Sequence, residues 1–574
     1  MDEQIWEHLN FIYGPETAAA VQPRLAQLLS EYQAAIRAAG TRHVFDQRDA
    51  VLITYGDMVY HQQEPPLYTL AGFLNSHLQG VVNTVHLLPF YPSSSDDGFS
   101  VIDYRAVDPA IGDWEHIGEI DRHFRLMFDA VINHISAQSF WFQAFLAGDP
   151  QYQDYFVAVD PAVDLSAVFR PRALPLLTEF QTTAGPRHVW TTFSPDQVDL
   201  NYANPDLLLA ITDLLLSYVS RGAELIRLDA IAFMWKEIGS RCIHLPKTHR
   251  IIQFWRRILD MVAPQIALIT ETNVPHKDNI TYFGDGTNEA QMVYNFSLPP
   301  LVLHAFHTGN AEFLTRWAKT LAPPSRQTTF FNFLASHDGI GLTPAWALLP
   351  NEAVAAMAER ALALGGQVSY RHNSDGSQSA YELNINYLDA LGDPERPETT
   401  IAEVANRFLT SQAIMLALPG VPGIYFHSLF GSNGWPEGVR QTGRFRSINR
   451  QKLPIEQLES ELEAIGSLRQ QVFSGYRQLL AVRANSTVFH PHGRHEVLSL
   501  HPAVFAIRRI SPDGKYTVLC LHNVSAETQI IRAEKLPMDW RSRQLRELVS
   551  DRFYVPPLSL PPYAILWLER VSAW

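Results

Sequence analysis

Short apolar runs alternate with longer segments of helical spacing over most of this chain. Eight such runs occupy residues 51–55, 84–90, 126–134, 225–232, 267–273, 292–297, 329–337 and 421–426. Strands that alternate with helices predict a parallel sheet, and eight of them predict a closed barrel. We therefore expect an α/β fold built on a (β/α)8 TIM barrel.

The run at 225–232 contains two charges within an otherwise apolar strand. Side chains two residues apart lie on one face of a strand, so Arg227 and Asp229 should lie together. Burying both costs free energy unless they pair or take part in chemistry. This run alone leaves two interpretations open, a structural ion pair and a functional site.

Three further runs also end in polar residues. Two of these runs carry Glu271 and Asp338 at their ends, so with Asp229 three carboxyl groups are expected at strand ends. All strand ends of such a barrel open on one face, where active sites are built. Cleavage of a glycosidic bond with retention needs two carboxyl groups about 5–5.5 Å apart, and neighbouring strands lie about 4.8 Å apart. The pattern therefore favours a glycosidase-type site.

The remaining segments suggest attachments to the barrel. Helical spacing at 16–39, before Gly40, predicts a helix in an N-terminal extension at 1–48. The barrel should then occupy 49–134, 200–339 and 401–487. Long insertions at 135–199, after strand three, and at 340–400, after strand seven, should overhang the strand ends. Alternating runs separated by turn residues predict an antiparallel β domain at 488–574.

Composition narrows the possible partners. Hydrophobic residues make up 46% and charged residues 18%, as in globular proteins. A net charge of −14 argues against nucleic acid as a binding partner. Cys242 and Cys520 lack metal spacing, and the N-terminus resembles neither a signal peptide nor a membrane span. We expect a soluble cytoplasmic protein without a membrane partner; a homodimer is compatible with the sequence.

The four strand-end runs resemble the four signature regions of the α-amylase superfamily, glycoside hydrolase family 13. The matching residues are 129–134, 227–229, 271 and 337–338. The resemblance implies that Asp229 is the nucleophile, Glu271 the general acid/base and Asp338 the stabiliser of the transition state. It also implies that Arg227 keeps Asp229 ionised, and a carboxyl group beside a guanidinium should indeed have a lowered pKa. His134 and His337 would then bind sugar hydroxyls.

Other segments resemble the sucrose phosphorylase-like subfamily. Residues 96–104 are similar to its glucose-binding loop, which implies that Asp96 binds terminal hydroxyls and Phe99 forms an apolar platform. Arg450 would be a second cation closing this pocket. Residues 189–197 are similar to the acceptor-site segment, which implies that Phe193 and Gln197 contact the acceptor.

Residues 169–172 resemble the phosphate-handling loop of the same subfamily. Two arginines held by a proline, Arg170 and Arg172, can present planar donors to phosphate, although a solvated basic loop has the same composition. Where sucrose phosphorylases carry Tyr-Gln, this chain reads Tyr381-Glu382. The acceptor pocket has therefore changed, with Tyr381 and Glu382 as its expected contacts.

Taken whole, the chain is most similar to the glucosylglycerate phosphorylase branch, through residues 170–176, Lys236, His244 and 379–391. Lys236 and His244 would border the acceptor pocket, unless they belong to a solvated helix start. The resemblance implies double displacement without a cofactor, with inorganic phosphate as co-substrate.

Alternatives remain open for the substrate, the chemistry and a metal. The substrate could instead be glucosylglycerol, sucrose or sucrose 6-phosphate, and a catalytically silent sugar-binding barrel is the alternative of another class. Amylases often bind calcium through an asparagine at the position of Asn133. No cluster of aspartates accompanies it, so we predict no metal.

Overall fold

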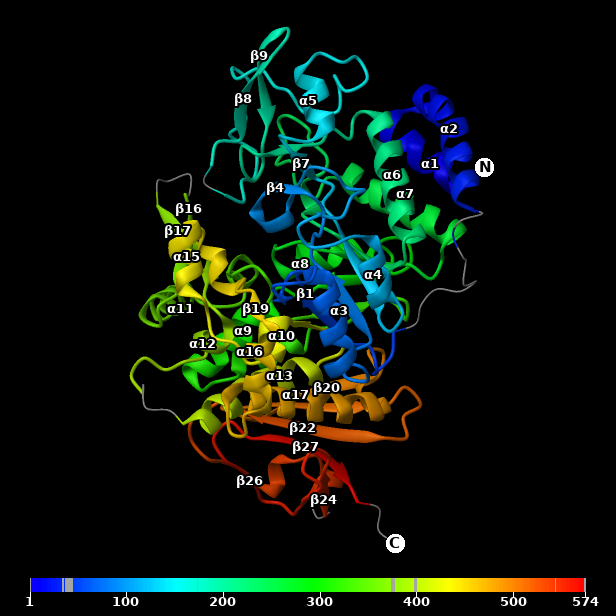
Figure 1. The fold of residues 1–574 in the computed structure, drawn as a ribbon. Coiled ribbons are helices and arrows are strands. Elements are labelled where there is room, and N and C mark those ends of the chain that lie inside the picture. The colour runs from blue at the N-terminus through cyan, green and yellow to red at the C-terminus, as the bar shows by residue number, and fades with distance from the viewer. Residues whose placement is uncertain are drawn as a thin grey trace.

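The fold is a closed barrel of eight parallel strands (Figure 1). The computed structural model describes residues 2–33, 36, 45–172, 174–372, 377–396, 400–541 and 544–571. In chain order the barrel strands are β1 (Val51–Thr54), β3 (Thr84–Leu87), β6 (Arg125–Ala130), β11 (Ala223–Leu228), β12 (Ala267–Thr270), β13 (Met292–Tyr294), β14 (Thr329–Asn332) and β18 (Val421–Tyr425). The eight expected strands are the eight observed, so the (β/α)8 TIM barrel is confirmed.

The strands end earlier than the apolar pattern predicted. β11 stops at Leu228 and not at residue 232, and β14 stops at Asn332 and not at 337. Ala230 has φ 49°, a left-handed conformation that cannot continue a strand. Asp229, Glu271 and Asp338 therefore lie on loops at the barrel mouth, outside the ladder of the barrel.

Helices cover the outside of the barrel. They include α3 (Pro66–His77), α4 (Trp114–Asp121), α6 (Pro205–Ser220), α7 (Pro246–Val262), α9 (Leu298–Thr308), α10 (Glu312–Ala318), α13 (Ile401–Ala417) and α17 (Leu468–Asn485). Start signals are visible in the sequence: the Asn204 side chain caps α6 by accepting from the Asp206 N–H, with Pro205 in its first turn. Both faces of the barrel strands are thus buried.

Short elements occupy the loops between the barrel strands and helices. They are β2 (Val59–Tyr60), β4 (Ser93–Ser95), β5 (Ser100–Val101), α8 (His276–Asn279), α14 (Phe426–Leu429), α15 (Pro436–Thr442), β19 (Leu453–Pro454) and α16 (Ile455–Glu463).

Two helices form the N-terminal extension. The helix predicted at 16–39 corresponds to α2 (Pro15–Gln33), and its expected stop at Gly40 lies outside the described residues. The preceding helix α1 (Glu3–Tyr13) was not predicted, although Asp2 supplies an N-cap signal. Asp2 also accepts a 2.9 Å hydrogen bond from Arg257 Nε, which ties α1 to α7.

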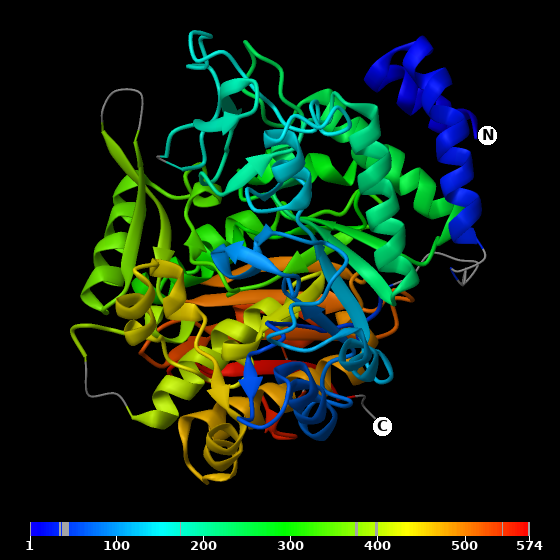
Figure 2. The same cartoon turned by 45° about the horizontal axis from the view of Figure 1, so that its top comes forward.

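Both insertions carry secondary structure of their own. The first holds β7 (His134–Ser136), α5 (Phe140–Leu146), β8 (Leu177–Thr182), β9 (Gly185–Trp190) and β10 (Gln197–Asp199). The second holds β15 (Ile340–Gly341), α11 (Asn351–Ala363), β16 (Gln367–His372), β17 (Gln378–Asn384) and α12 (Tyr387–Ala390). Figures 1 and 2 show the β8–β9 and β16–β17 hairpins rising on the same side of the barrel.

The C-terminal part is the antiparallel domain that the sequence predicted. Its main sheet has the order β20-β21-β22-β27-β24-β25, with β20 (Arg494–His501), β21 (Val504–Ile510), β22 (Thr517–Asn523), β27 (Ile565–Arg570), β24 (Leu545–Glu547) and β25 (Phe553–Tyr554). A second ribbon pairs β23 (Gln529–Ile531) with β26 (Leu558–Leu560). This domain lies at the opposite end of the molecule from the first insertion (Figure 1). Among the described helices, none is long and apolar enough to span a membrane.

Candidate active site

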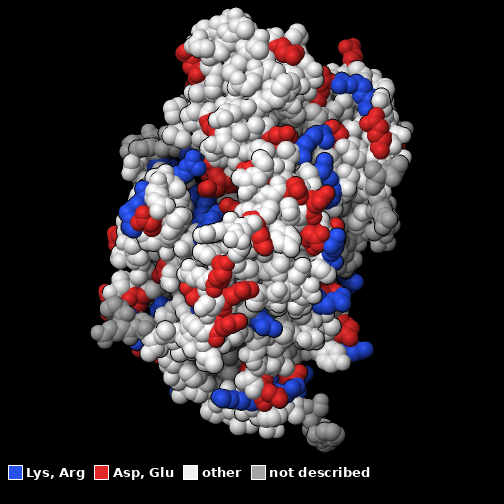
Figure 3. Space-filling model, viewed as in Figure 1, with Lys and Arg blue, Asp and Glu red and all other residues white. Residues whose placement is uncertain are grey.

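A pocket opens at the carboxyl ends of the barrel strands, beneath the two insertions. The space between its walls, open solvent at the mouth included, is about 1080 Å³. Thirteen of the sequence-predicted residues line it: Asp96, Phe99, His134, Arg170, Arg172, Phe193, Gln197, Asp229, Glu271, His337, Asp338, Tyr381 and Glu382. In Figure 3, acidic and basic side chains gather side by side below the upper lobe, near the β16–β17 hairpin.

Arg227 lies beneath the pocket floor. Its Nη1 donates to Asp229 Oδ1 at 2.8 Å and also pairs with the buried Asp129. Asp129 in turn contacts His86 Nε2 at 2.7 Å. A buried cation between two carboxylates is compensated on both sides, which is the condition under which such burial is tolerated. Arg227 therefore contacts Asp229 from behind and does not line the pocket.

Asp229 and Glu271 come from neighbouring strands in register. Leu228 pairs with Thr270 across β11 and β12, so Asp229 and Glu271 each follow directly after that pair. The N–H of Ala230 donates to Glu271 Oε2 at 3.0 Å, which fixes the Glu271 side chain beside the Asp229 loop. Adjacent strands lie about 4.8 Å apart, so carboxyl groups at their ends can supply the separation of about 5–5.5 Å that retaining glycoside chemistry requires.

The pKa values of these two groups are coupled. Burial raises the pKa of Asp229 well above its ordinary value, Arg227 opposes this rise, and the charge of Glu271 adds to it. Burial likewise raises the pKa of Glu271. The expectation that Arg227 gives Asp229 a lowered pKa is therefore wrong, because desolvation and the second carboxylate outweigh one guanidinium.

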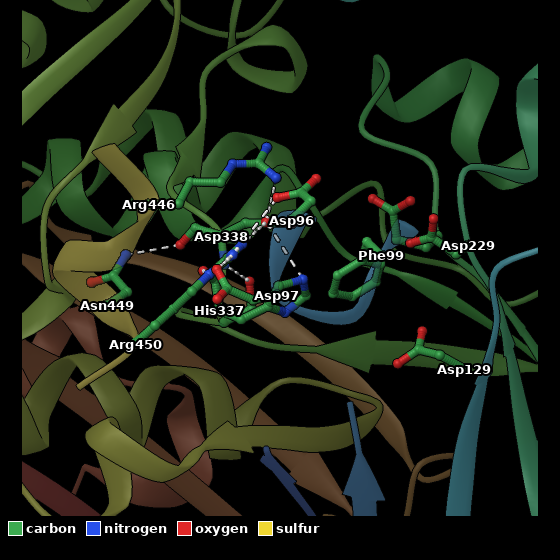
Figure 4. Close-up of polar contacts among 12 residues, drawn as sticks. Asp96, Asp97, Phe99, Asp129, Asp229, His337, Asp338, Arg446, Asn449 and Arg450 are labelled. Carbon is green, nitrogen blue, oxygen red and sulfur yellow. Dashed lines mark hydrogen bonds and ion pairs between the residues drawn. The ribbon is translucent and has the colours of Figure 1, made fainter. Parts of the chain in front are cut away.

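Asp338 has two basic partners (Figure 4). Arg446 Nη1 lies 2.6 Å from Asp338 Oδ1, and Arg450 Nη2 lies 3.4 Å from the same oxygen. Burial opposes ionisation of Asp338, but Arg446, His337 and Arg450 together hold its pKa well below the usual range. Asp338 is thus a stable anion at the pocket wall.

Arg446 was not predicted from the sequence. It lies in the short 3-10 helix Phe445–Asn449 and lines the pocket. Its Nη2 donates to Glu382 Oε1 at 2.8 Å, and its Nε donates to Glu382 Oε2 at 3.3 Å. Glu382 is buried, and this pair occupies both of its oxygens. The carboxylate that replaces the expected glutamine therefore positions an arginine in the pocket.

Arg450 does not close the pocket as the sequence suggested. It is buried behind the wall, where its Nε donates to the His337 carbonyl at 2.9 Å. It also pairs with Asp97 and lies 3.7 Å from Asp96 Oδ1. The guanidinium therefore holds the acidic loop in place and leaves contact with the pocket to Asp96.

The loop carrying Asp96 is held in an uncommon backbone conformation. Asp96 and Asp97 have φ values of 54° and 48°. Gly98 follows at φ 105°, where a Cβ would lie 2.5 Å from the Pro89 carbonyl oxygen, so only glycine fits. Strain of this kind is common at functional sites. Burial opposes ionisation of Asp96, but Arg172 and Arg450 hold its pKa well below the ordinary range.

Aromatic and imidazole rings form the inner wall. Phe99 stacks on His337 with ring centroids 4.6 Å apart and planes 5° apart. Burial lowers the pKa of His337 to about 3 and also lowers that of His134. Both rings are therefore neutral near pH 7, and a neutral imidazole can exchange hydrogen bonds with sugar hydroxyls.

The first insertion contributes basic and polar side chains to the lining of the pocket. Arg172 lies 5.4 Å from the centre of the Phe193 ring and 3.6 Å from Asp96. Arg170 donates to the carbonyl of Leu174. Gln197 Nε2 donates to the Phe99 carbonyl oxygen at 3.0 Å and lies 3.2 Å from His134 Nε2.

Lys236 and His244 do not border the pocket. Lys236 Nζ lies 2.6 Å from Asp199 Oδ2 and 3.1 Å from Asn133 Oδ1, in a buried site. His244 Nδ1 lies 2.8 Å from the Tyr282 hydroxyl. The cation beside Asn133 is therefore an ammonium of the chain itself. Within the described ranges, no group of three or more His, Cys, Asp or Glu has metal-binding geometry.

Comparison with known proteins shows where this chain is similar. The α-amylase catalytic-domain model matches residues 77–342. A glucosylglycerate phosphorylase from Spirochaeta thermophila is 49% identical and covers 99% of this chain and 98% of the relative. The protein of the same name from Escherichia coli is 45% identical and covers 99% of this chain and 100% of the relative. A sucrose phosphorylase from Agrobacterium vitis is 30% identical and covers 72% of this chain and 84% of the relative.

Solved structures share the architecture. The sucrose 6F-phosphate phosphorylase from Thermoanaerobacter thermosaccharolyticum has a TM-score of 0.71 at 24% identity, covering 83% of this chain and 94% of that chain. The α-amylase from H. orenii has a TM-score of 0.65 at 19% identity, covering 92% and 100%. At these identities the likeness shows the fold alone.

Proposed function

The chain belongs to the α-amylase family, in the branch of the glucosylglycerate phosphorylases, and on that basis we propose that it phosphorolyses 2-O-α-glucosylglycerate. The products are α-glucose 1-phosphate and glycerate. The observation that carries the proposal is identity of 45–49% over 99% of the chain to three proteins of that name. Sucrose, glucosylglycerol and sucrose 6-phosphate phosphorylases reach 25–30%.

In the first step, Asp229 attacks C1 of the glucosyl unit. The bond from C1 to the 2-oxygen of glycerate breaks, and Glu271 gives its proton to that oxygen. Glycerate leaves, and the glucosyl unit remains as an ester of Asp229. The adjacent positions of the two residues after β11 and β12 support this assignment.

Asp229 and Glu271 hold one proton between them, and for this step that proton must lie on Glu271. Each carboxylate raises the energy of charging the other, so the buried pair retains one proton near neutrality. The Arg227 guanidinium donates to Asp229 at 2.8 Å, whereas Glu271 accepts from the neutral amide of Ala230. A charge-assisted bond favours the anion, which leaves Asp229 ionised and Glu271 protonated.

In the second step, phosphate takes the place of glycerate. One of its oxygens attacks C1, the ester bond to Asp229 breaks, and Glu271 accepts the proton of the attacking group. Two inversions give the α-anomer. Arg170 and Arg172 orient the phosphate and offset its charge, which favours phosphate over water as nucleophile.

The glucosyl unit is held at the inner end of the pocket. Asp96 accepts hydrogen bonds from its terminal hydroxyls, and Phe99 packs on its apolar face. His134 and His337 contact the remaining hydroxyls, and Asp338 stabilises the positive charge of the transition state. Phe193, Gln197, Tyr381 and Arg446, held by Glu382, face the acceptor.

The proposal involves no cofactor. Inorganic phosphate is the co-substrate, and the remaining partners are the small glucoside and its products. We also propose a cytoplasmic location and a homodimer. Light scattering on the purified protein tests the dimer, and a monomeric mass would remove it.

The test is phosphate-dependent release of α-glucose 1-phosphate from four glucosides. Glucosylglycerate, glucosylglycerol, sucrose and sucrose 6-phosphate are compared at equal concentrations with a coupled phosphoglucomutase assay. We expect the highest kcat/KM with glucosylglycerate. A higher value for another glucoside would overturn the acceptor, and phosphate-independent release of glucose would overturn phosphorolysis.

A further inference from the structure

Arg371, on β16 of the second insertion, lines the same pocket as Asp229 and Glu271. The first insertion brings Arg170 and Arg172 to that pocket from another wall. Figure 2 shows the hairpin of β16 and β17 standing apart from the lobe formed by the first insertion. Arg371 is therefore placed to contact a bound acceptor from a direction that the expected phosphate-binding arginines do not cover.

Among the described residues, four arginines line the pocket, and three of them have polar partners. Arg446 is paired with Asp338 and Glu382. Arg172 lies 3.6 Å from Asp96, and Arg170 donates to a backbone carbonyl. The charges of Arg446 and Arg172 are thus offset by carboxylates within the protein.

Arg371 differs from these three arginines. Its guanidinium carbon lies 4.1 Å from the centre of the Trp346 ring. Its Nε is buried and has no hydrogen-bond partner within the part of the chain that the structure describes. Stacking occupies one face of the guanidinium plane and leaves the N–H donors along its edge free. Burial also lowers the pKa of Arg371.

A planar anion fits these donors. A carboxylate accepts two parallel N–H bonds from one guanidinium, and such charge-assisted pairs are stronger than neutral hydrogen bonds. The carboxylate of glycerate is attached to the carbon that carries the glycosidic oxygen. A glucoside seated on Asp229 and Glu271 therefore carries this anion into the part of the pocket that the acceptor occupies.

We propose that Arg371 binds the carboxylate of glycerate and makes the enzyme select an anionic acceptor over a neutral one. This inference rests on the proposed function and adds the residue that recognises its acceptor. Trp346 fixes the guanidinium, and Glu382 keeps Arg446 from competing for the same anion.

The experiment measures glucosyl transfer from α-glucose 1-phosphate to two acceptors, glycerate and the uncharged glycerol. Wild type is compared with Arg371→Gln, Arg371→Lys and the matched control Arg187→Gln. Arg187 is an exposed hairpin arginine outside the pocket lining. Circular dichroism and thermal melts verify that each variant is folded.

We expect Arg371→Gln to lower the ratio of kcat/KM for glycerate to that for glycerol by about 10- to 100-fold, the size of one charged hydrogen bond. Most of the loss should appear as a higher KM for glycerate. Arg371→Lys should recover part of the ratio, because it keeps the charge and loses the planar fork. Arg187→Gln should keep the wild-type ratio.

Two results would overturn the inference, and they are distinguishable. If wild type glucosylates glycerate and Arg371→Gln leaves the ratio unchanged, Arg371 does not bind the carboxylate and the proposed function stands. If wild type glucosylates glycerol but not glycerate, the proposed function itself fails, and the role of Arg371 fails with it.

Discussion

Replacing Arg446 with methionine tests the link between the pocket wall and the chemistry. The substitution keeps an unbranched apolar stem and removes the guanidinium with its charge. Asp338 then loses its nearer cation, at 2.6 Å, and keeps Arg450 at 3.4 Å. Glu382 loses the donor that occupies both of its oxygens.

The size of the effect follows from these contacts. A hydrogen bond to a charged group is worth about 1.5–3 kcal/mol. Loss of the bond that orients Asp338 should therefore lower kcat/KM for phosphorolysis about 10- to 150-fold. Since the buried Glu382 loses its cationic partner, the free energy of unfolding at pH 7 should also fall, by up to about 3–5 kcal/mol.

The pH dependence of kcat/KM provides an independent test of the contact between Arg446 and Asp338. In wild type, Arg446 is the largest of the contributions that lower the pKa of Asp338 against the effect of burial. Without it the pKa rises, so the acid limb of kcat/KM should move to higher pH. A carboxyl group with a depressed pKa stabilises the fold above its unfolded pKa of about 3.9, and this contribution is lost as the pH falls towards the folded pKa. The difference in the free energy of unfolding between wild type and Arg446→Met should therefore shrink on acidification.

The assay is kcat/KM for phosphorolysis from pH 4.5 to 8, with thermal melts at each pH. The matched control is Arg440→Met, an exposed arginine on α15 that pairs with Glu437. It should change neither quantity appreciably. If Arg446→Met keeps kcat/KM within twofold and leaves the acid limb in place, the reasoning that ties Arg446 to Asp338 is refuted.

Three further predictions test other parts of the site. Glu271→Gln should slow phosphorolysis of the natural glucoside about 10²- to 10⁴-fold but slow that of α-glucosyl fluoride much less, because fluoride leaves without a proton; equal losses would contradict its acid role. Arg172→Ala should reduce phosphorolysis more than residual hydrolysis, and an equal fall in both would remove Arg172 from the phosphate site. Lys236→Met should lower the melting temperature, since Asp199 loses the ammonium at 2.6 Å, and an unchanged value would show that this buried pair does not stabilise the fold.

The barrel could be predicted because its strands are buried on both faces and therefore read as continuous apolar runs. Asp229 and Glu271 could be located for the same reason, since each is a carboxylate within such an apolar run. The strand ends could not be located, because they depend on pairing and on the left-handed Ala230, which apolar residues alone do not reveal.

Arg371, Arg446 and Lys236 show where prediction from sequence fails. Arg446 contacts Glu382, 64 residues away, because the short 3-10 helix Phe445–Asn449 packs against β17. Lys236 contacts Asp199 across the barrel mouth, although its sequence context suggested the pocket rim. No periodicity relates such residues, so their partners emerge only when loops of different strands are brought together in space.

The central claim is that Asp229 receives a glucosyl unit from glucosylglycerate and passes it to phosphate with retention. One proton NMR time course of the enzyme with 2-O-α-glucosylglycerate and phosphate tests it directly. We predict that the anomeric signal of α-glucose 1-phosphate grows in equal amount with free glycerate. A β-phosphate signal, or free glucose in its place, would contradict the account.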